Sequence, residues 1–216
     1  MKLEPAVRPL TDPERRRLEE HAAELRRSAR RGPRGAVEVA ALAAAVLWVL
    51  TLVVSDAPWR VVTLFWIVVG TFLAVWARRE QVSASRDLRA AAGALDSALA
   101  RGEAEVYDIR AERYAELEEV EDEGACWAFQ LDGGRVVFLA GQEMYPAPGF
   151  PSLDFSLAYA LDGSGRAVHL WIEPRGEAVP PERVIPAAVK ARLADRLPAH
   201  LEVVRADLDR LEEALG

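Results

Sequence analysis

A dense run of carboxylates is the first part of this sequence whose residue types could do chemistry. It reads Glu116-Leu117-Glu118-Glu119-Val120-Glu121-Asp122-Glu123-Gly124. Carboxylate oxygens are the ligands that hard divalent cations take in proteins, so a metal-assisted enzyme is one hypothesis. However, the run lacks the alternating Asp/Asn positions and the central glycine of a calcium loop. The pattern favours a solvated acidic surface, and we predict no metal site.

Histidine, cysteine and serine, the other side chains that commonly carry catalysis, are scattered along the chain. The histidines are His21, His169 and His200, and none has a second metal ligand at a typical spacing. The one cysteine, Cys126, lies in an apolar run, which is typical of a buried small side chain. The sequence contains no nucleophile elbow and no phosphate-binding glycine loop. We therefore predict no catalytic residues, no cofactor and no enzymatic activity.

The elements that would position any site begin with two uncharged apolar runs. They cover residues 39–55 and 61–77, seventeen residues each. At about 1.5 Å per residue, each run approaches the hydrocarbon thickness of a bilayer. The short link between them contains Pro58, which suits a turn between antiparallel helices. We predict a transmembrane helical hairpin over residues 36–78, with spans at about 37–55 and 60–77.

Arginines flank the two runs on the sides away from the link. The link carries only Arg60, whereas the flanking arginines nearest the runs are Arg30, Arg31, Arg34, Arg78 and Arg79. Basic residues are retained in the cytoplasm, so we expect both termini there. A composition rich in Ala, Arg and Leu is compatible with a bacterial inner membrane. We predict a multi-pass inner-membrane protein whose first partner is the lipid bilayer.

Charge is distributed unevenly between the two ends of the chain. Residues 1–35 carry ten Lys/Arg against six Asp/Glu, whereas residues 102–216 carry eleven against twenty-three. An acidic distal segment does not attract nucleic acid by electrostatics. Nucleic acid is therefore not an expected partner.

The remaining segments divide by their hydrophobic period. Residues 1–35 are predicted to form an N-terminal cytoplasmic amphipathic helix, starting near Thr11, and residues 79–102 a juxtamembrane helix that continues the second span. Residues 103–175 alternate with period two around two Asp-Gly-containing turns, which predicts an antiparallel β-sheet or open barrel of about five strands. Residues 176–216 are predicted to form amphipathic helices. The predicted class is an α+β membrane protein.

Two apolar patterns in the cytoplasmic part suggest interaction. Met144, Tyr145 and Phe150 lie on a Pro/Gly-rich loop, which either covers one end of the sheet or is an exposed recognition loop. A possible helix–helix seam has apolar residues at spacings of three and four: Leu201, Val204, Leu208, Leu211 and Leu215. It would pack on another helix of the chain or mediate self-association.

The leading functional hypothesis is a non-enzymatic interaction or sensory module held at the membrane. A protein partner or a second copy of the chain would bind through the cytoplasmic domain. The first alternative is a small oligomeric channel or transporter accessory subunit, which requires Thr51, Thr63 and Gly70 to line a polar path. The second alternative is the metal-assisted enzyme.

Overall fold

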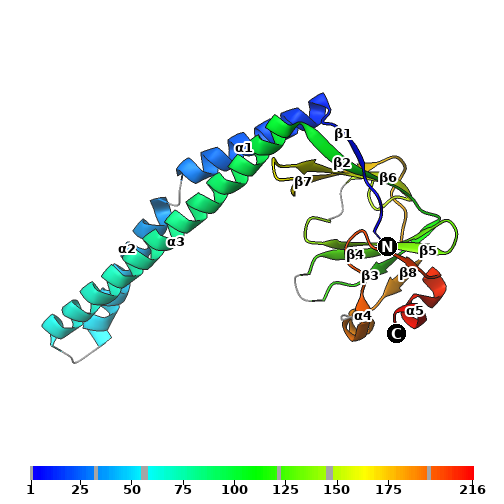
Figure 1. The fold of residues 1–216 in the computed structure, drawn as a ribbon. Coiled ribbons are helices and arrows are strands. Elements are labelled where there is room, and N and C mark those ends of the chain that lie inside the picture. The colour runs from blue at the N-terminus through cyan, green and yellow to red at the C-terminus, as the bar shows by residue number, and fades with distance from the viewer. Residues whose placement is uncertain (1, 32–33, 55–57, 121–122, 145–147, 194–195) are drawn as a thin grey trace. The chain divides into compact units, whose positions relative to one another are not determined.

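The computed structural model describes residues 2–31, 34–54, 58–120, 123–144, 148–193 and 196–216. It divides into two compact units (Figure 1). Asp12–Ala100 form a helical unit. Met1–Thr11 and Arg101–Gly216 form a unit that contains two β-sheets and short helices. The class is α+β, as the sequence predicts.

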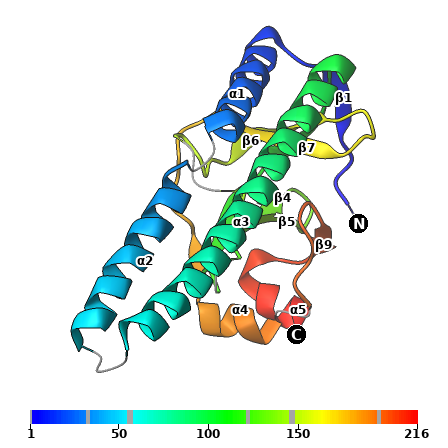
Figure 2. The same cartoon turned by 90° about the vertical axis from the view of Figure 1, so that its left-hand side faces the viewer.

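The helical unit contains α1 (Asp12–Arg31), α2 (Arg34–Val54) and α3 (Trp59–Arg101). The start of α1 agrees with the capping sequence, and α3 is continuous through the predicted span and juxtamembrane helix. In both views α1 lies beside the C-terminal half of α3 (Figures 1 and 2). An ion pair between Arg26 and Asp96 joins these two helices.

Only part of the predicted hairpin meets the length and composition of a membrane span. Among the described residues, α3 is the one helix that is long and apolar enough to cross a membrane. The apolar part of α2 is shorter, Ala41–Val54. The link residues 55–57 lie outside the described residues.

Two reciprocal hydrogen bonds join α2 to α3. The indole Nε1 of Trp48 donates to the Thr63 hydroxyl at 3.2 Å, and the indole Nε1 of Trp66 donates to the Thr51 hydroxyl at 3.1 Å. A Cβ added at Gly70 of α3 would lie 3.9 Å from the Ala44 Cβ of α2. Two indoles and two threonine hydroxyls are thus used in the contact between the two helices.

The β unit has nine strands among the described residues, against the predicted five or so. One sheet has the order β1 (Ala6–Pro9), β2 (Glu103–Arg110), β6 (Asp154–Leu161) and β7 (Ala167–Pro174). The other has the order β8 (Arg183–Ile185), β3 (Arg113–Leu117), β4 (Ala125–Leu131), β5 (Arg135–Gly141) and β9 (Val203–Arg205). All pairings are antiparallel except that of β8 with β3.

The difference in strand number has a simple origin. The five predicted strands correspond to β2, β4, β5, β6 and β7, each seven or eight residues long. The missed strands β1, β3, β8 and β9 have three to five residues. A segment this short shows no clear alternation, and it becomes a strand because a neighbouring edge offers unpaired N–H and C=O groups. Residues 6–9 therefore belong to the β unit rather than to an N-terminal helix.

The five-stranded sheet is covered on both faces. One face packs on the four-stranded sheet, where Phe129 of β4 lies 5.0 Å from Phe155 of β6 between ring centroids. The opposite face packs on the C-terminal segments through Leu208 and Leu211. Burial on both faces explains why β4 is buried at nearly every position instead of alternating.

The predicted C-terminal seam is wrong as a continuous helix. Leu201 lies in a turn at φ 61°, and Val204 lies in β9. The helices with described bounds in this segment are α4 (Ala187–Leu193), the 3-10 turn η2 (Leu208–Arg210) and α5 (Leu211–Leu215). Residues 203–205 pair with the edge of β5, and satisfying that edge outweighs the local helical pattern. The five seam residues consequently do not share one face.

The loop residues Met144 and Phe150 are buried, so the recognition-loop hypothesis is wrong for both. The Phe150 ring centroid lies 5.2 Å from that of Trp127 and 5.1 Å from that of Phe155. Aromatic packing at this distance removes apolar area from water, which decides the position of the loop. Both side chains cover one end of the core between the sheets. Tyr145 lies outside the described residues.

Candidate functional site

Two carboxylates of the acidic run, Glu118 and Glu119, fix local structure. Glu118 accepts a hydrogen bond at 2.9 Å from the backbone N–H of Ala187, the first residue of α4. Glu119 accepts one at 2.9 Å from the N–H of Gly124. Glu121 and Asp122 lie outside the described residues. In the described part of the chain, no group of three His, Cys, Asp or Glu side chains is arranged to hold a metal ion.

The last carboxylate of the acidic run forms an ion pair with a buried lysine. Glu123 lies 3.0 Å from the ammonium group of Lys190, whose side chain is 4% exposed. A buried ammonium requires such a partner, because desolvation disfavours its charge. Nearby, burial raises the pKa of the Cys126 thiol to about 11, so this cysteine is not a reactive thiolate at neutral pH.

The basic residues predicted to flank the membrane lie on the helical unit. Arg30 is exposed near the end of α1, and Arg78 and Arg79 are exposed on α3. Arg31 ends α1 and Arg34 begins α2. These positions bracket the apolar parts of α2 and α3, and their role in flanking a membrane stays a prediction.

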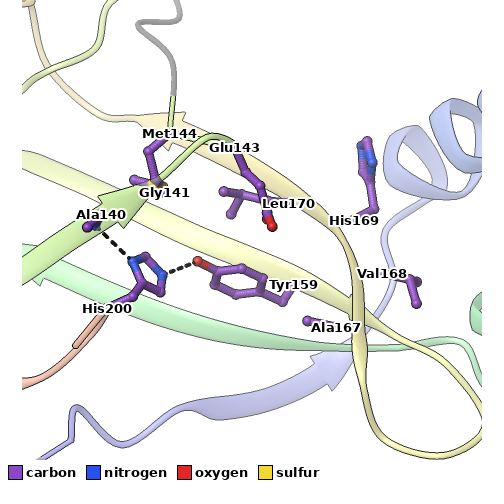
Figure 3. A pocket seen from close by; sticks show the side chains of 10 residues that line it. All are labelled: Ala140, Gly141, Glu143, Met144, Tyr159, Ala167, Val168, His169, Leu170 and His200. Carbon is purple, nitrogen blue, oxygen red and sulfur yellow. Dashed lines mark hydrogen bonds between the residues drawn. The ribbon is translucent and has the colours of Figure 1, made fainter. Parts of the chain in front are cut away.

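A cavity of about 350 Å³ in the β unit is the best-formed candidate site (Figure 3). It opens between the end of β5, the facing strands β6 and β7, and the turn before β9. Its lining residues are Ala140, Gly141, Glu143, Met144, Tyr159, Ala167, Val168, His169, Leu170 and His200. The lining is mostly apolar with a few polar groups, which is the usual composition of a small-molecule site.

Backbone contacts of the turn before β9 place His200 at the cavity. The N–H of Leu201 donates to the Phe138 carbonyl of β5 at 2.7 Å, and the Leu201 carbonyl accepts from the N–H of Leu3 at 3.1 Å. These bonds hold Leu201 at φ 61°, a conformation that a leucine rarely adopts. The turn therefore directs the preceding residue, His200, toward β5 and β6.

The hydrogen bonds of His200 define its protonation state (Figure 3). Its Nδ1 accepts a hydrogen bond at 3.2 Å from the backbone N–H of Ala140, so Nδ1 carries no proton. The neutral ring therefore carries its proton on Nε2, which lies 2.6 Å from the Tyr159 hydroxyl oxygen. Nε2–H donates to that oxygen. The hydroxyl hydrogen of Tyr159 remains for another acceptor.

Burial shifts both groups away from acid–base chemistry at neutral pH. Burial lowers the pKa of His200, and the charge of Lys2 lowers it further. Burial also raises the pKa of Tyr159, with a further contribution from the Glu143 carboxylate. A base of low pKa and an acid of high pKa are poor proton-transfer partners at pH 7. The pair is better suited to binding through hydrogen bonds.

The remaining polar groups lie around this pair. The Glu143 carboxylate is exposed at the cavity. The His169 ring on β7 packs edge-on against Trp171, with centroids 4.8 Å apart. One hydroxyl donor, one carboxylate and apolar walls would suit a small ligand that has a hydrogen-bond acceptor and an N–H or cationic group.

Sequence reasoning singled out His169, His200 and Met144 separately, and the structure brings all three to one cavity. The sequence patterns did not indicate Tyr159 or Glu143. Tyr159 and His200 are 41 positions apart, and no local pattern links them. The only signal within the sequence is a tyrosine in an apolar strand, whose hydroxyl needs a partner when buried.

Comparison with protein-family models, curated proteins and solved structures finds no match to this chain.

Proposed function

We propose that this protein is a non-enzymatic sensory module, anchored in the inner membrane by α2 and α3, whose β unit binds a small ligand in the cytoplasm. The observation that carries the proposal is the part-buried Tyr159–His200 pair at the 350 Å³ cavity. Binding there would be read by a protein partner or by a second copy of the chain.

The exposed apolar surface of α2 and α3 supports the membrane anchor. Only 6% of the most apolar part of α3 is buried within the protein. Leu42, Leu64 and Phe72 are 66%, 65% and 68% exposed. Leaving apolar area in water costs about 25 cal/mol per Å², and lipid removes that cost.

The contact between α2 and α3 supports two spans rather than one. Both hydrogen bonds between Trp48, Thr63, Trp66 and Thr51 lie within the apolar segments, so α2 would follow α3 through the bilayer. A short apolar stretch is accommodated by local thinning of the bilayer and by snorkelling of its flanking residues. The flanking arginines favour cytoplasmic termini. Because both threonine hydroxyls are used between the helices, the channel alternative loses part of the polar lining that it needs.

The chemistry of the cavity supports binding without catalysis. Both ring nitrogens of His200 are engaged, and Tyr159 stays protonated with one hydrogen to donate. A ligand acceptor would take that hydrogen, while an N–H or cationic group of the ligand would face Glu143. Such a ligand would close the space between β5 and β7.

Ligand binding is tested by thermal unfolding of the full-length protein in detergent against a library of compounds smaller than the cavity. We expect a compound that raises the Tm of the wild type and has little effect on Tyr159→Phe or His200→Gln. Tyr107→Phe is the matched control, because its hydroxyl bonds to Glu105 on β2 and does not line the cavity. Stabilisation that persists in both site variants would exclude this cavity.

Anchoring and orientation are tested in membranes. Carbonate extraction should leave the chain in the membrane. In a Cys126→Ala background, Glu177→Cys places one exposed thiol in the loop after β7. A membrane-impermeant maleimide should label that thiol only after the cytoplasmic side is opened. Labelling of intact cells would reverse the proposed orientation.

A further inference from the structure

A basic groove lies on α3 immediately after its apolar part. It has a volume of about 430 Å³ and is lined by Val75, Arg78, Arg79, Val82, Ser83 and Arg86. Steps of three, one, three, one and three positions keep these residues on one face of a helix. The groove thus belongs to a single helical surface.

The arginines of the groove lack the carboxylate partners that other arginines of the chain have. No Asp or Glu lies three or four positions from Arg78, Arg79 or Arg86 along the helix. Within the described residues, none of the three forms an ion pair, and all three are exposed. By contrast, Arg113 pairs with Glu182, Asp207 and Asp209. The lining of the groove therefore carries three arginines and no carboxylate.

The position of the groove along α3 matches the headgroup layer of a bilayer. Arg78 follows the last residue of the uncharged run, Ala77. Arg86 lies about 12 Å further along the axis at about 1.5 Å per residue. The headgroup layer on each side of the hydrocarbon is several ångströms thick. Arg78 and Arg79 would lie at the depth of lipid phosphates, with Arg86 on the aqueous side of that layer.

We propose that this groove binds the headgroup of an anionic phospholipid, an inference that rests on the proposed membrane anchor. The guanidinium groups of Arg78 and Arg79 hold the lipid phosphate by paired N–H donors, and the Ser83 hydroxyl adds a donor. Val75, which is 51% exposed and lies three positions before Arg78 on the hydrocarbon side, contacts the apolar part of the same lipid. A zwitterionic headgroup fits less well, because its own cation offsets the phosphate charge.

The test uses the full-length protein in an uncharged detergent, with phosphatidylglycerol, phosphatidylcholine or sodium phosphate added. The apparent affinity is taken from the dependence of Tm on probe concentration. We expect phosphatidylglycerol to stabilise the protein more than phosphatidylcholine does. Arg78→Gln/Arg79→Gln/Arg86→Gln should bind phosphatidylglycerol about a hundredfold more weakly, given three lost arginine contacts.

The matched control removes the same charge elsewhere on the helical unit. Arg15→Gln/Arg16→Gln/Arg17→Gln on α1 should leave the affinity for phosphatidylglycerol within about twofold of wild type, because these residues lie outside the groove. Both variants should have the wild-type Tm without lipid. An equal loss in both variants would overturn the groove as the site.

Three other outcomes also decide the question. Equal stabilisation by both lipids overturns selectivity for an anionic headgroup. Stabilisation by sodium phosphate equal to that by phosphatidylglycerol shows a site for free anions instead of lipid. Release of the chain by carbonate would refute the membrane anchor itself, whereas a retained chain that does not distinguish the lipids overturns only this inference.

Discussion

The Tyr159 hydroxyl oxygen lies 2.6 Å from Nε2 of His200, a residue 41 positions later in the chain. The other nitrogen of the ring accepts a hydrogen bond from the backbone of β5. This arrangement connects β6 of one sheet to β5 of the other through one neutral imidazole. It leaves one hydroxyl hydrogen of Tyr159 to donate, which supports the proposal that the cavity binds a ligand.

The first prediction concerns the pH dependence of stability at His200. The ordinary pKa of histidine is 6.5, and burial lowers it in the folded state. As pH falls below about 6.5, the unfolded chain gains a proton that the folded ring resists, so the wild type should lose stability by up to about 1.4 kcal/mol per pH unit. Urea unfolding of the wild type and His200→Gln at pH 8 and pH 5.5 measures this loss. The stability difference between the two proteins should change with pH in favour of the variant at pH 5.5.

The second prediction concerns Asp162 in the turn between β6 and β7. Hydrogen bonds from the Ser164 hydroxyl and the Arg166 N–H lower the pKa of Asp162 to about 2. A depressed pKa contributes stability above the ordinary value of 3.8, and that contribution is lost as pH falls toward 2. Asp162→Asn should therefore have a lower free energy of unfolding than the wild type at pH 7. Between pH 4 and pH 2 the variant should lose less of that free energy than the wild type does.

Asp132→Asn, in the turn between β4 and β5, is the matched control for this prediction. Its carboxylate is exposed and pairs with Arg135 at 2.5 Å. An exposed ion pair of this kind contributes at most about 1 kcal/mol to the free energy of unfolding. If both aspartate variants show the same stability at pH 7, the turn hydrogen bonds of Asp162 are not decisive.

The third prediction separates packing from recognition at Phe150. This side chain is 3% exposed and contacts Trp127 and Phe155. Phe150→Ala should lower the free energy of unfolding by about 3–5 kcal/mol, because it leaves a cavity in the core. Val184 is 47% exposed, so Val184→Ala should lower the free energy of unfolding by less than about 1 kcal/mol. A Phe150→Ala protein of unchanged stability would restore the recognition-loop hypothesis.

The fourth prediction concerns the contact between α2 and α3. Thr51→Val/Thr63→Val removes both hydroxyls that accept hydrogen bonds from the tryptophan indoles. Each hydrogen bond between helices in a membrane contributes about 0.6 kcal/mol to the free energy of unfolding. Thr71→Val is the control, because that hydroxyl donates to the Ile67 carbonyl of its own helix. Unfolding by increasing amounts of a denaturing detergent should show that the free energy of unfolding falls by about 1 kcal/mol in the double variant only. Equal effects in both would mean that these bonds do not hold α2 against α3.

Local patterns predict elements well where one residue period extends over enough positions. The capping sequence predicts the start of α1 at Asp12, and the long apolar and amphipathic stretches predict α3. The two Asp-Gly-containing turns correctly predict both long hairpins, β4–β5 and β6–β7. The C-terminal leucines show where this fails, because a spacing of three and four is also compatible with residues that serve two different faces of a sheet.

What the sequence by itself determined is the separation of a helical, arginine-flanked apolar segment from an acidic β/α segment, together with the longer strands and helices. These features depend on hydrophobic period and on turn residues, which act over a few positions. Only the tertiary structure decided that residues 203–205 form an edge strand, that Met144 and Phe150 are buried, and that Tyr159 meets His200. Each of these depends on satisfying the backbone groups or covering the apolar area of a distant element, and no local pattern records such a contact.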